Sequence, residues 1–342
     1  MATSQSRVAV IMLTYNSVSK LGSFFDEVLQ GVLMQDYPSL EVIFVDNASG
    51  DGTPDYIKSY IERLGGREYK VLLLKRNRGW SGGNNIGALL AKDAEYLFFM
   101  NDDVILEQSC IRTLIDAISN HQNLAAVQPL IMNKDGSLNY GLDLGLSGFP
   151  KMIQHQRGDS LCNAFYVSGA ALLTRSGAFF DVGMFDDSLF IYHDDADYSW
   201  RLRLMGYEVA CVTNARAYHW GSATLGSESP QYFYFLTRNN IWIIAKNSSL
   251  VWIFPRLFLM LIETLISFFG YMLMKKNTKV ALHILRALLE GFMNLHIPFS
   301  RRASIAKIKR VKEKEVNRVM STLIDVDLIF PRTLRRVLGL KW

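Results

Sequence analysis

The sequence predicts an α/β fold with a mostly parallel central sheet flanked by helices, followed by a C-terminal helical region. Two observations carry this prediction: β-rich runs alternate with helical patterns through the first half of the chain, and polar clusters follow four of those runs. In a sheet of this kind the ligands gather at the carboxyl ends of the strands. The 342 residues can bury one large core and leave a C-terminal appendage.

Six short apolar runs are predicted to be strands. The first four cover residues 7–13, 40–45, 70–74 and 95–100, and two later ones, at 170–173 and 208–212, extend the sheet. Between the first two, apolar residues recur at spacings of three and four, which predicts a crossover helix. These residues are Leu21, Phe24, Phe25, Val28 and Leu29.

A polar cluster follows each of the first four predicted strands. Any one of them could be an ordinary turn, since Asn, Asp, Ser and Gly are common loop residues. Four clusters at the ends of four successive strands instead favour one shared ligand site. They are Thr14-Tyr15-Asn16, Asp46-Asn47-Ala48-Ser49, Asn77-Arg78-Gly79 and Asn101-Asp102-Asp103.

The C-terminal part of the chain has a different composition. Residues 250–274 are mostly apolar, but Pro255, Arg256 and Glu263 interrupt them, so the uninterrupted stretches fall short of the roughly 20 residues of a membrane span. One or two helices lying in a membrane interface are predicted, with a buried hairpin of a soluble protein as the alternative. The predicted division is a folded domain at 1–245 and a helical, membrane-associating region at 246–342.

The net charge of +5 hides an asymmetry between the two ends. Residues 275–342 hold 16 Lys and Arg against 5 Asp and Glu, while the remainder of the chain is acidic by 6. Because the basic tail follows an apolar segment, anionic lipid is the expected partner, and nucleic acid is not. The basic residues nearest the apolar segment are Lys275, Lys276, Lys279, Arg301, Arg302, Lys307, Lys309 and Arg310.

The cysteines and the amino terminus bear on location. Cys110, Cys162 and Cys211 are widely spaced and form neither a CxxC pair nor an even disulfide framework, which favours a reducing compartment. The polar start followed by a brief apolar run does not resemble a signal peptide. We therefore expect the N-terminal domain at the cytoplasmic face of the cell membrane, as a peripheral or monotopic protein.

Two acidic groups are candidates for chemistry. Asp102 and Asp103 follow the apolar run 96–100, and such a pair can hold Mg²⁺ or Mn²⁺ against a diphosphate. Asp194, Asp195 and Asp197 lie before a helical pattern, where a carboxylate could act as general base or simply cap the helix.

A late histidine is a further candidate. His219 follows a strand-like run and could add an imidazole ligand to the metal, although a lone histidine can equally be structural.

These motifs together resemble family 2 glycosyltransferases of the GT-A fold, and most of all the rhamnosyltransferase and galactofuranosyltransferase branch. The resemblance covers roughly residues 7–245 and rests on several separated motifs in the family's order. The motifs are Thr14-Tyr15-Asn16, the stretches 45–53 and 77–87, Asn101-Asp102-Asp103 and Asp194-Asp195-Ala196-Asp197.

The resemblance implies a donor site for a nucleoside diphosphate sugar, linked to dTDP or UDP. Thr14, Tyr15 and Asn16 would line the nucleoside pocket, and Asp46 would accept a hydrogen bond from the pyrimidine imide. Asn77 and Gly79 would approach the base or ribose. Four more residues are implied to be donor-binding, with Gly83 letting the backbone pass close to the ligand: Trp80, Gly83, Asn84 and Asp102.

The same resemblance assigns the metal and the chemistry. Asp103 would coordinate Mg²⁺ or Mn²⁺, Asn101 stands where many members have a first Asp, and His219 falls where related enzymes place a metal-binding histidine. Asp195 corresponds to the family's catalytic base. Three residues are assigned auxiliary or acceptor roles, with Asp194 replacing the usual Glu: Asp194, Asp197 and Trp220.

The expected function is inverting, metal-dependent transfer of a single sugar, with rhamnose as the best guess, to a hydroxyl of a polyprenyl-linked saccharide in cell-surface glycan or glycoprotein glycan synthesis. The Gln-x-x-Arg-Trp signature of processive polymerases is absent from the sequence. Alternatives are a sugar nucleotidyltransferase, which would want a Gly-rich basic loop near its first strand, and a catalytically degenerate membrane-associated binding protein.

Overall fold

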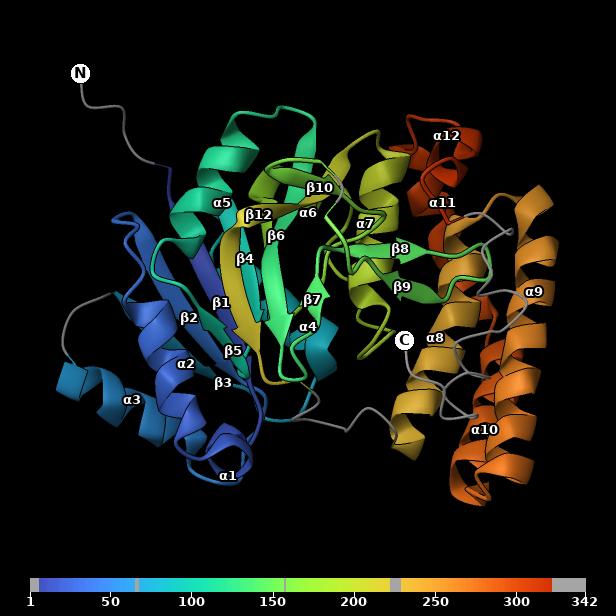
Figure 1. Ribbon diagram of the computed structural model, residues 1–342, viewed down its shortest axis with the longest axis horizontal. Coiled ribbons are helices and arrows are strands. Elements are labelled where there is room, and N and C mark those ends of the chain that lie inside the picture. The colour runs from blue at the N-terminus through green and yellow to red at the C-terminus, as the bar shows by residue number, and fades with distance from the viewer. Residues whose placement is uncertain (1–5, 65–67, 157, 222–228, 322–342) are drawn as a thin grey trace. The chain divides into compact units, whose positions relative to one another are not determined.

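The computed structural model describes residues 6–64, 68–156, 158–221 and 229–321. The chain forms two compact units (Figure 1): unit 1 comprises Met1–Leu142 and Met152–Thr224, and unit 2 comprises Asp143–Lys151 and Leu225–Trp342. The predicted boundary at residue 245 falls inside α8 (Pro230–Asn247). That helix packs against α10 (Thr278–Met293), so the division lies before it. The last part of the predicted C-terminal region, 322–342, lies outside the described residues.

The amino-terminal half of the sheet is parallel, as predicted. β1 (Val8–Thr14) lies between β2 (Leu40–Asp46) and β4 (Tyr96–Asn101), and β3 (Tyr69–Leu73) pairs with β2. Thr14 lies opposite Asp46, and Leu13 lies opposite Asn101. The polar clusters after these strands therefore meet at one edge of the sheet.

The remaining strands make the sheet mixed. β11 (Ala171–Arg175) is antiparallel to β4 and to β6 (Leu124–Asn133), and β12 (Glu208–His219) is parallel to β6. The predicted strands at 170–173 and 208–212 are confirmed as β11 and the first part of β12. Short antiparallel strands complete the sheet, namely β5 (Val104–Leu106), β7 (Leu138–Asn139) and β10 (Leu161–Asn163).

Helices cover the sheet of unit 1. The predicted crossover stripe forms α2 (Phe24–Leu33), which buries Phe25, Val28 and Leu29. α4 (Gly79–Leu90) packs against β1 and β2. The other helices of this unit are α1 (Ser17–Leu21), α3 (Thr53–Leu64), α5 (Cys110–Ser119), α6 (Ser176–Asp181) and α7 (Asp194–Leu204).

Unit 2 is helical and includes a small ribbon. α9 (Leu250–Phe269) continues into the π-helical turn η1 (Gly270–Met274) without a break at Pro255. By length and composition alone, the helical segment Leu250–Met274 could cross a membrane. From the sequence, its apolar stretches were expected to be too short for a span. The remaining elements are α11 (His296–Ile308), bent by 57° from α10, α12 (Glu313–Asn317), and the ribbon of β8 (Leu142–Leu144) and β9 (Pro150–Met152).

The ribbon is fastened to the helices of unit 2 by close contacts. Gly148 has a left-handed backbone (φ 78°), and a Cβ there would lie 2.0 Å from Asn240 Oδ1. Asn240 Nδ2 donates to Ser147 O (3.0 Å), and Ser321 N–H donates to Leu144 O (3.1 Å). Residues 143–151 therefore belong structurally with chain segments that follow much later in the sequence.

Candidate active site

Two loops are hydrogen-bonded to each other where β1 and β2 end. Asn16 has a left-handed backbone (φ 52°); its N–H donates to Ser49 Oγ (2.9 Å), and its Oδ1 accepts from Gly50 N–H (2.8 Å). Asp46 is buried, and its carboxylate accepts from Thr14 Oγ1 (3.3 Å), Ser49 Oγ (2.5 Å) and Ser49 N–H (2.9 Å). The buried Asp46 carboxylate thus holds the two loops together through these hydrogen bonds.

Asn47, to which the sequence assigned no role, fastens the start of α4 to the end of β2. Its Oδ1 accepts from Arg78 N–H (2.7 Å), and its Nδ2 donates to Asn77 Oδ1 (3.0 Å). Asn77 Oδ1 also accepts from Gly79 N–H (2.8 Å). Gly79 has φ 73°, and a Cβ there would lie 2.3 Å from Phe190 O, so glycine is required. Asn77 and Gly79 therefore order this loop.

Trp80 links three segments at the candidate site. Its Nε1 donates to Asn101 Oδ1 (2.8 Å), and its backbone N–H donates to Phe190 O (2.6 Å). A Cβ on Gly169 would lie 2.7 Å from Trp80 Cζ2, so the indole and the Gly169 backbone are in direct contact. The end of β4, the loop before α7 and residue 169 are held together by this one residue.

Gly83 and Asn84, which were predicted to bind the donor, contact neighbouring parts of the protein. A Cβ on Gly83 would lie 2.3 Å from Leu13 Cδ1, so this glycine lets α4 approach β1 closely. Asn84 is fully buried, and its Nδ2 donates to Trp80 O (3.0 Å) within the same helix. Both residues serve the packing of α4 in this structure.

Asp102 turns toward the β1–α1 loop. Its Oδ2 accepts from Ser17 Oγ (2.5 Å) and from Tyr15 N–H (3.4 Å). Burial, together with the adjacent Asp103, raises the pKa of Asp102 to about 6. Ser17, which the sequence prediction omitted, is the hydroxyl that holds this carboxylate.

Lys20 is a second residue that the prediction missed. Its Nζ donates to Tyr15 O (2.6 Å) and lies 4.5 Å from the centre of the Tyr15 ring. Burial lowers the pKa of Lys20, and the charges of Asp102, Asp51 and Asp103 oppose that shift. The positive charge of the Lys20 side chain therefore lies close to Asp102 and Asp103. A single lysine carries no spacing signal, which is why the sequence did not single it out.

Asp103 faces the end of β12. Its Oδ1 is 3.3 Å from His219 Nε2, and its backbone carbonyl accepts from Trp220 N–H (3.0 Å). Asp103 is 4 % exposed, and its Oδ1 has no hydrogen-bond partner within the described part of the chain. The structure thus brings together the two residues that were predicted to bind a metal.

This pair is compatible with a divalent cation. Two ligand atoms in neighbouring positions on an octahedral cation, each at about 2.1 Å, lie about 3 Å apart, close to the separation seen here. The described residues contain no group of three His, Cys, Asp or Glu that could hold a metal by itself. Mg²⁺ and similar cations commonly take one or two protein ligands and complete their shell with substrate phosphates and water.

Trp220 directly follows the end of β12, and its ring packs against α2. Its ring centroid is 4.6 Å from that of Phe24, and Lys134 Nζ lies 3.6 Å from its centroid. The predicted role of Trp220 at the acceptor stays a prediction.

The loop before α7 has an unusual backbone. Phe190, Tyr192 and His193 all have positive φ (69°, 68° and 62°), a conformation that non-glycine residues rarely adopt. Asn85 holds the start of this loop through two hydrogen bonds to the backbone of Phe185, at 2.9 and 3.0 Å. Such conformations persist only where the surroundings enforce them, and they cluster at functional sites.

Asp195 lies at the start of α7 with both carboxylate oxygens bonded to backbone. Oδ2 accepts from Gly169 N–H (3.0 Å), and Oδ1 accepts from Ala196 N–H (2.8 Å). Burial raises the pKa of Asp195, and those two hydrogen bonds oppose the rise. A raised pKa makes the carboxylate a stronger base.

Asp194 and Asp197 have other surroundings. Asp194 accepts from Ser81 Oγ (3.2 Å), and burial followed by the charge of Asp195 raises its pKa to about 8. Asp197 is fully buried and pairs with Arg201 Nη2 (2.9 Å) one helical turn later. Asp197 therefore anchors α7. Its side chain has no exposed surface that would support the predicted role at the acceptor.

The two acidic groups converge through a short chain of contacts. Asp195 accepts from Gly169 N–H, and Asn101 N–H donates to the next carbonyl, Ala170 O (3.0 Å). Trp80 contacts both Gly169 and Asn101. The carboxylates of residues 102–103 and 194–195, about 90 positions apart in the sequence, are thus built on one structural junction.

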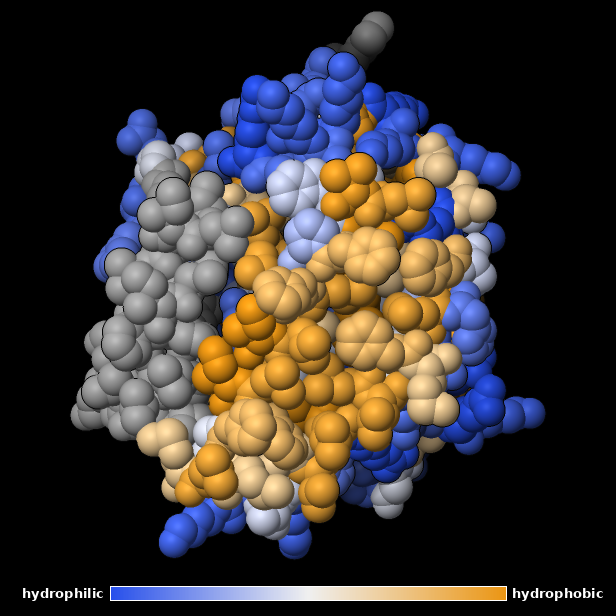
Figure 2. All heavy atoms as spheres, turned by 90° about the vertical axis from the view of Figure 1, so that its right-hand side faces the viewer, coloured by the Kyte–Doolittle hydropathy of each residue, from blue (hydrophilic) through white to orange (hydrophobic). Residues whose placement is uncertain are grey.

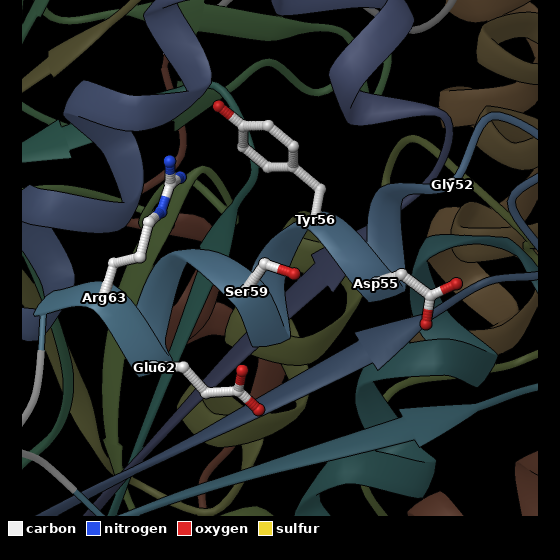
Figure 3. A pocket seen from close by; sticks show the side chains of 6 residues that line it. All are labelled: Gly52, Asp55, Tyr56, Ser59, Glu62 and Arg63. Atoms are coloured by element: carbon white, nitrogen blue, oxygen red, sulfur yellow. The ribbon is translucent and has the colours of Figure 1, made fainter.

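A surface hollow elsewhere in unit 1 is unrelated to this junction. Figure 3 shows its lining side chains along α3 and at the residue just before it. None of them is a predicted site residue. They are Gly52, Asp55, Tyr56, Ser59, Glu62 and Arg63.

Comparison with known sequences gives a family match. A sequence model described as "Glycosyl transferase family 2" matches residues 9–179. The chain is also 25 % identical over 222 residues to poly-beta-1,6-N-acetyl-D-glucosamine synthase of Staphylococcus epidermidis, covering 64 % of this chain and 51 % of that protein. The chain thus spans about half the length of the curated relatives it matches.

Comparison with solved structures gives the fold. The mannosyltransferase PcManGT from Pyrobaculum calidifontis, in complex with GDP-Man and Mn²⁺, matches with a TM-score of 0.55 at 15 % identity, covering 99 % of this chain and 89 % of that one. S. aureus TarS in complex with UDP-GlcNAc matches with a TM-score of 0.57 at 16 % identity, covering 97 % and 90 %. Both likenesses indicate a GT-A-like fold.

Proposed function

The chain belongs to glycosyl transferase family 2, and we propose that it transfers a single sugar from a nucleoside diphosphate donor to an acceptor hydroxyl with inversion, using Asp195 as the base. The observation that carries the proposal is the junction at Trp80 and Gly169, on which the acidic groups of residues 102–103 and 194–195 are both built. The catalytic base and the group that stabilises the leaving diphosphate must both lie near the transferred sugar. A junction that carries both acidic groups supports that arrangement.

In the proposed step, Asp195 takes the proton of the acceptor hydroxyl while that oxygen forms a bond to the anomeric carbon. The bond from the anomeric carbon to the diphosphate oxygen breaks, and the nucleoside diphosphate leaves with the electron pair. Asp103 and His219 would hold Mg²⁺ or Mn²⁺, whose charge would stabilise the diphosphate. The raised pKa of Asp195 supports its role in accepting the proton.

We further propose that the donor is linked to dTDP or UDP, with rhamnose as the sugar. The support is the polar edge formed by the loops after β1 and β2, where Asp46 and Asn16 order the chain. The relatives named above take other sugars by their names, so the sugar is assigned by motif order alone. Absence of Gln-x-x-Arg-Trp from the 342 residues supports transfer of one sugar per acceptor.

The proposed acceptor is a polyprenyl-linked saccharide at the cytoplasmic face of the cell membrane, for synthesis of a cell-surface glycan or a glycoprotein glycan. Its support is the apolar helix Leu250–Met274 followed by basic residues. Membership of a glycosyltransferase family removes the sugar nucleotidyltransferase alternative.

Replacing the base tests the proposal. Asp195→Asn should retain donor binding, measured by thermal shift, and lower the rate of transfer by orders of magnitude, because the amide cannot accept the proton. Asp93→Asn is the matched control, since Asp93 is exposed before β4 begins, at the opposite edge of the sheet. Normal turnover by Asp195→Asn would remove Asp195 as the base.

Donor choice has its own test. We expect dTDP-rhamnose or UDP-linked sugars to raise the melting temperature more than GDP-mannose does, and Mn²⁺ to enlarge the shift through Asp103 and His219. The measurement is a thermal-shift screen of dTDP-rhamnose, UDP-galactofuranose, UDP-glucose and GDP-mannose, each with and without Mn²⁺. The largest shift with GDP-mannose would contradict the pyrimidine donor.

A further inference from the structure

Helix α9 and the turn η1 carry a continuous apolar stripe on their exposed side. Its residues recur every three or four positions, the spacing of one helix face. Phe254 is 80 % exposed and Leu273 is 67 % exposed, and the stripe also includes Val251, Phe258, Ile262, Leu265 and Phe269. At 1.5 Å per residue, the stripe from Val251 to Leu273 is about 33 Å long.

The opposite side of α9 is buried within unit 2 and carries the polar groups of the helix. Arg256 is fully buried; its guanidinium donates to Ser248 Oγ (2.7 Å) and lies 3.3 Å from Glu313 Oε1. Glu263 accepts from Ser147 Oγ (3.1 Å). These are the only two charged residues between 250 and 274, so no charge lies on the exposed stripe.

Helix α10 adds a second apolar stripe next to the first. Leu282, Leu285, Leu289 and Met293 are exposed on it at spacings of three and four, and α10 packs against α9. Figure 2 shows apolar side chains gathered over the side of the molecule where these helices lie. The apolar face is therefore two helices wide.

Cations flank this face. Lys275, Lys276 and Lys279 are all exposed at the corner where η1 leads into α10. Ammonium groups beside an apolar surface are complementary to anionic lipid, whose acyl chains and headgroups meet in the same order. A protein partner would have to bury the same apolar area and supply acidic groups at this corner.

The two sides of α9 decide how it would meet a bilayer. If α9 crossed the membrane, Arg256 and Glu263 would be drawn into hydrocarbon or lose Ser248, Glu313 and Ser147 as partners. If α9 lies flat, the stripe enters the acyl region and the polar side keeps its contacts. The contacts within unit 2 favour the flat arrangement.

We propose that α9, η1 and α10 lie in the plane of one leaflet of an anionic membrane, with their apolar stripes among the acyl chains and the lysines at the headgroups. This inference deepens the proposed lipid-linked acceptor and rests on it only for the biological purpose of the surface. Its test reads depth in the bilayer and not sugar transfer, so the two proposals fail separately.

The experiment places a fluorescent label on single cysteines along the stripe. Phe254→Cys, Ile262→Cys and Leu273→Cys are labelled with an environment-sensitive dye, and Ser59→Cys, exposed on α3, is the control. Cys110, Cys162 and Cys211 are buried and are replaced by alanine in parallel. Quenching is measured on vesicles of phosphatidylglycerol and phosphatidylcholine that carry a nitroxide at a shallow or a deep position.

We expect all three stripe labels to be quenched from the same shallow depth, while the Ser59→Cys label is not quenched. A deep label at 262 between shallow labels at 254 and 273 would show a span and overturn the flat arrangement. No quenching at any of the three would overturn the membrane surface itself. Blue-shifted labels without vesicles, in a dimer, would assign the face to a second copy of the chain.

Substitutions on the exposed stripe test the same surface without labels. Phe254→Ser with Phe258→Ser should lower partitioning into these vesicles about tenfold or more, because two exposed phenylalanines lose apolar burial. Met34→Ser, half exposed on the surface of unit 1, is the matched control and should leave partitioning unchanged. Equal partitioning of both variants would contradict the assignment.

Discussion

Neighbouring carboxylates at the start of α7 contact different groups and are expected to differ in role. Asp195 is held by the backbone N–H groups of Gly169 and Ala196, whereas Asp194 contacts only the hydroxyl of Ser81 among these groups. Burial, followed by the charge of Asp195, raises the pKa of Asp194 to about 8. Asp194 therefore carries a proton in the folded protein at neutral pH.

Stability should depend on this proton. The pKa of Asp194 is raised on folding, so its stabilising proton is fully present below the ordinary aspartate pKa and is lost as the pH rises through about 8. The melting temperature of the wild type should fall between about pH 4 and about pH 8 more steeply than that of Asp194→Asn, which stays neutral. Thermal unfolding at several pH values checks this, and equal slopes would contradict it.

The pH dependence of activity should reflect the pKa of Asp195. Asp195 can accept a proton only when it is ionised, and its pKa is raised by burial. The acid limb of the kcat/KM profile should therefore lie above the ordinary aspartate value of about 3.9. A pH profile measured at fixed Mn²⁺ tests this expectation, which fails if the rate stays flat down to that value.

The site residues that the sequence missed act through hydrogen bonds between distant segments. The acidic pairs were found because charged residues stand out after apolar runs. Asn47, Ser17 and Lys20 look like ordinary loop or helix residues until their partners at 77–79, 102 and 15 are known. Sequence spacing therefore located the edge of the sheet but not the bonds that order it.

At the scale of elements, α4 depends on its glycines for close packing. A Cβ at Gly83 would lie 2.3 Å from Leu13 Cδ1, and one at Gly87 would lie 2.5 Å from Ile11 Cγ2. The helix therefore rests almost directly on β1. Glycine in a helix interior is otherwise unfavourable, so the packing explains its presence here.

Alanine at Gly83 should destabilise unit 1. The added methyl group must displace Leu13 or the helix, which typically costs about 1–3 kcal/mol in a packed core. Gly177→Ala on α6 is the matched control, because a Cβ there meets nothing within 4 Å. Chemical denaturation of both variants tests this, and equal stability of the two would contradict the packing role.

The elements that the sequence predicted are those with long apolar runs. β1 to β4, α2 and the later strands β11 and β12 were located from such runs. Strands of two or three residues, such as β5, β7 and β10, were not, because so short a run carries no periodicity. In α9, Pro255 was expected to interrupt the apolar segment, but the helix runs on through it, with the proline as an interior residue.

At the scale of the whole molecule, the three cysteines are expected to report on unfolding. All are buried free thiols, and Cys162 lies opposite Cys211 in the β10–β12 pair, which their separation in the sequence did not suggest. Burial raises the pKa of the Cys110 and Cys211 thiols well above the usual range. Burial protects all three thiols from reagents, and the raised pKa protects Cys110 and Cys211 further.

Thiol titration should therefore separate folded from unfolded protein. A chromogenic disulfide reagent should react negligibly in native buffer and with all 3 cysteines in guanidinium chloride. Cys162→Ser should lower the final count by one. Rapid reaction in native buffer would show that unit 1 opens far more readily than this burial implies.

The ribbon of residues 143–151 has a consequence for how the protein is made. It leaves the ribosome well before Asn240, Glu263 and Ser321, the residues that later hold it, have been translated. Until then its flanking strands can fold while the ribbon waits without partners. A nascent chain stalled after unit 1 would therefore present an unfinished loop, which a holding chaperone or a protease could recognise before the helical segment arrives to cover it.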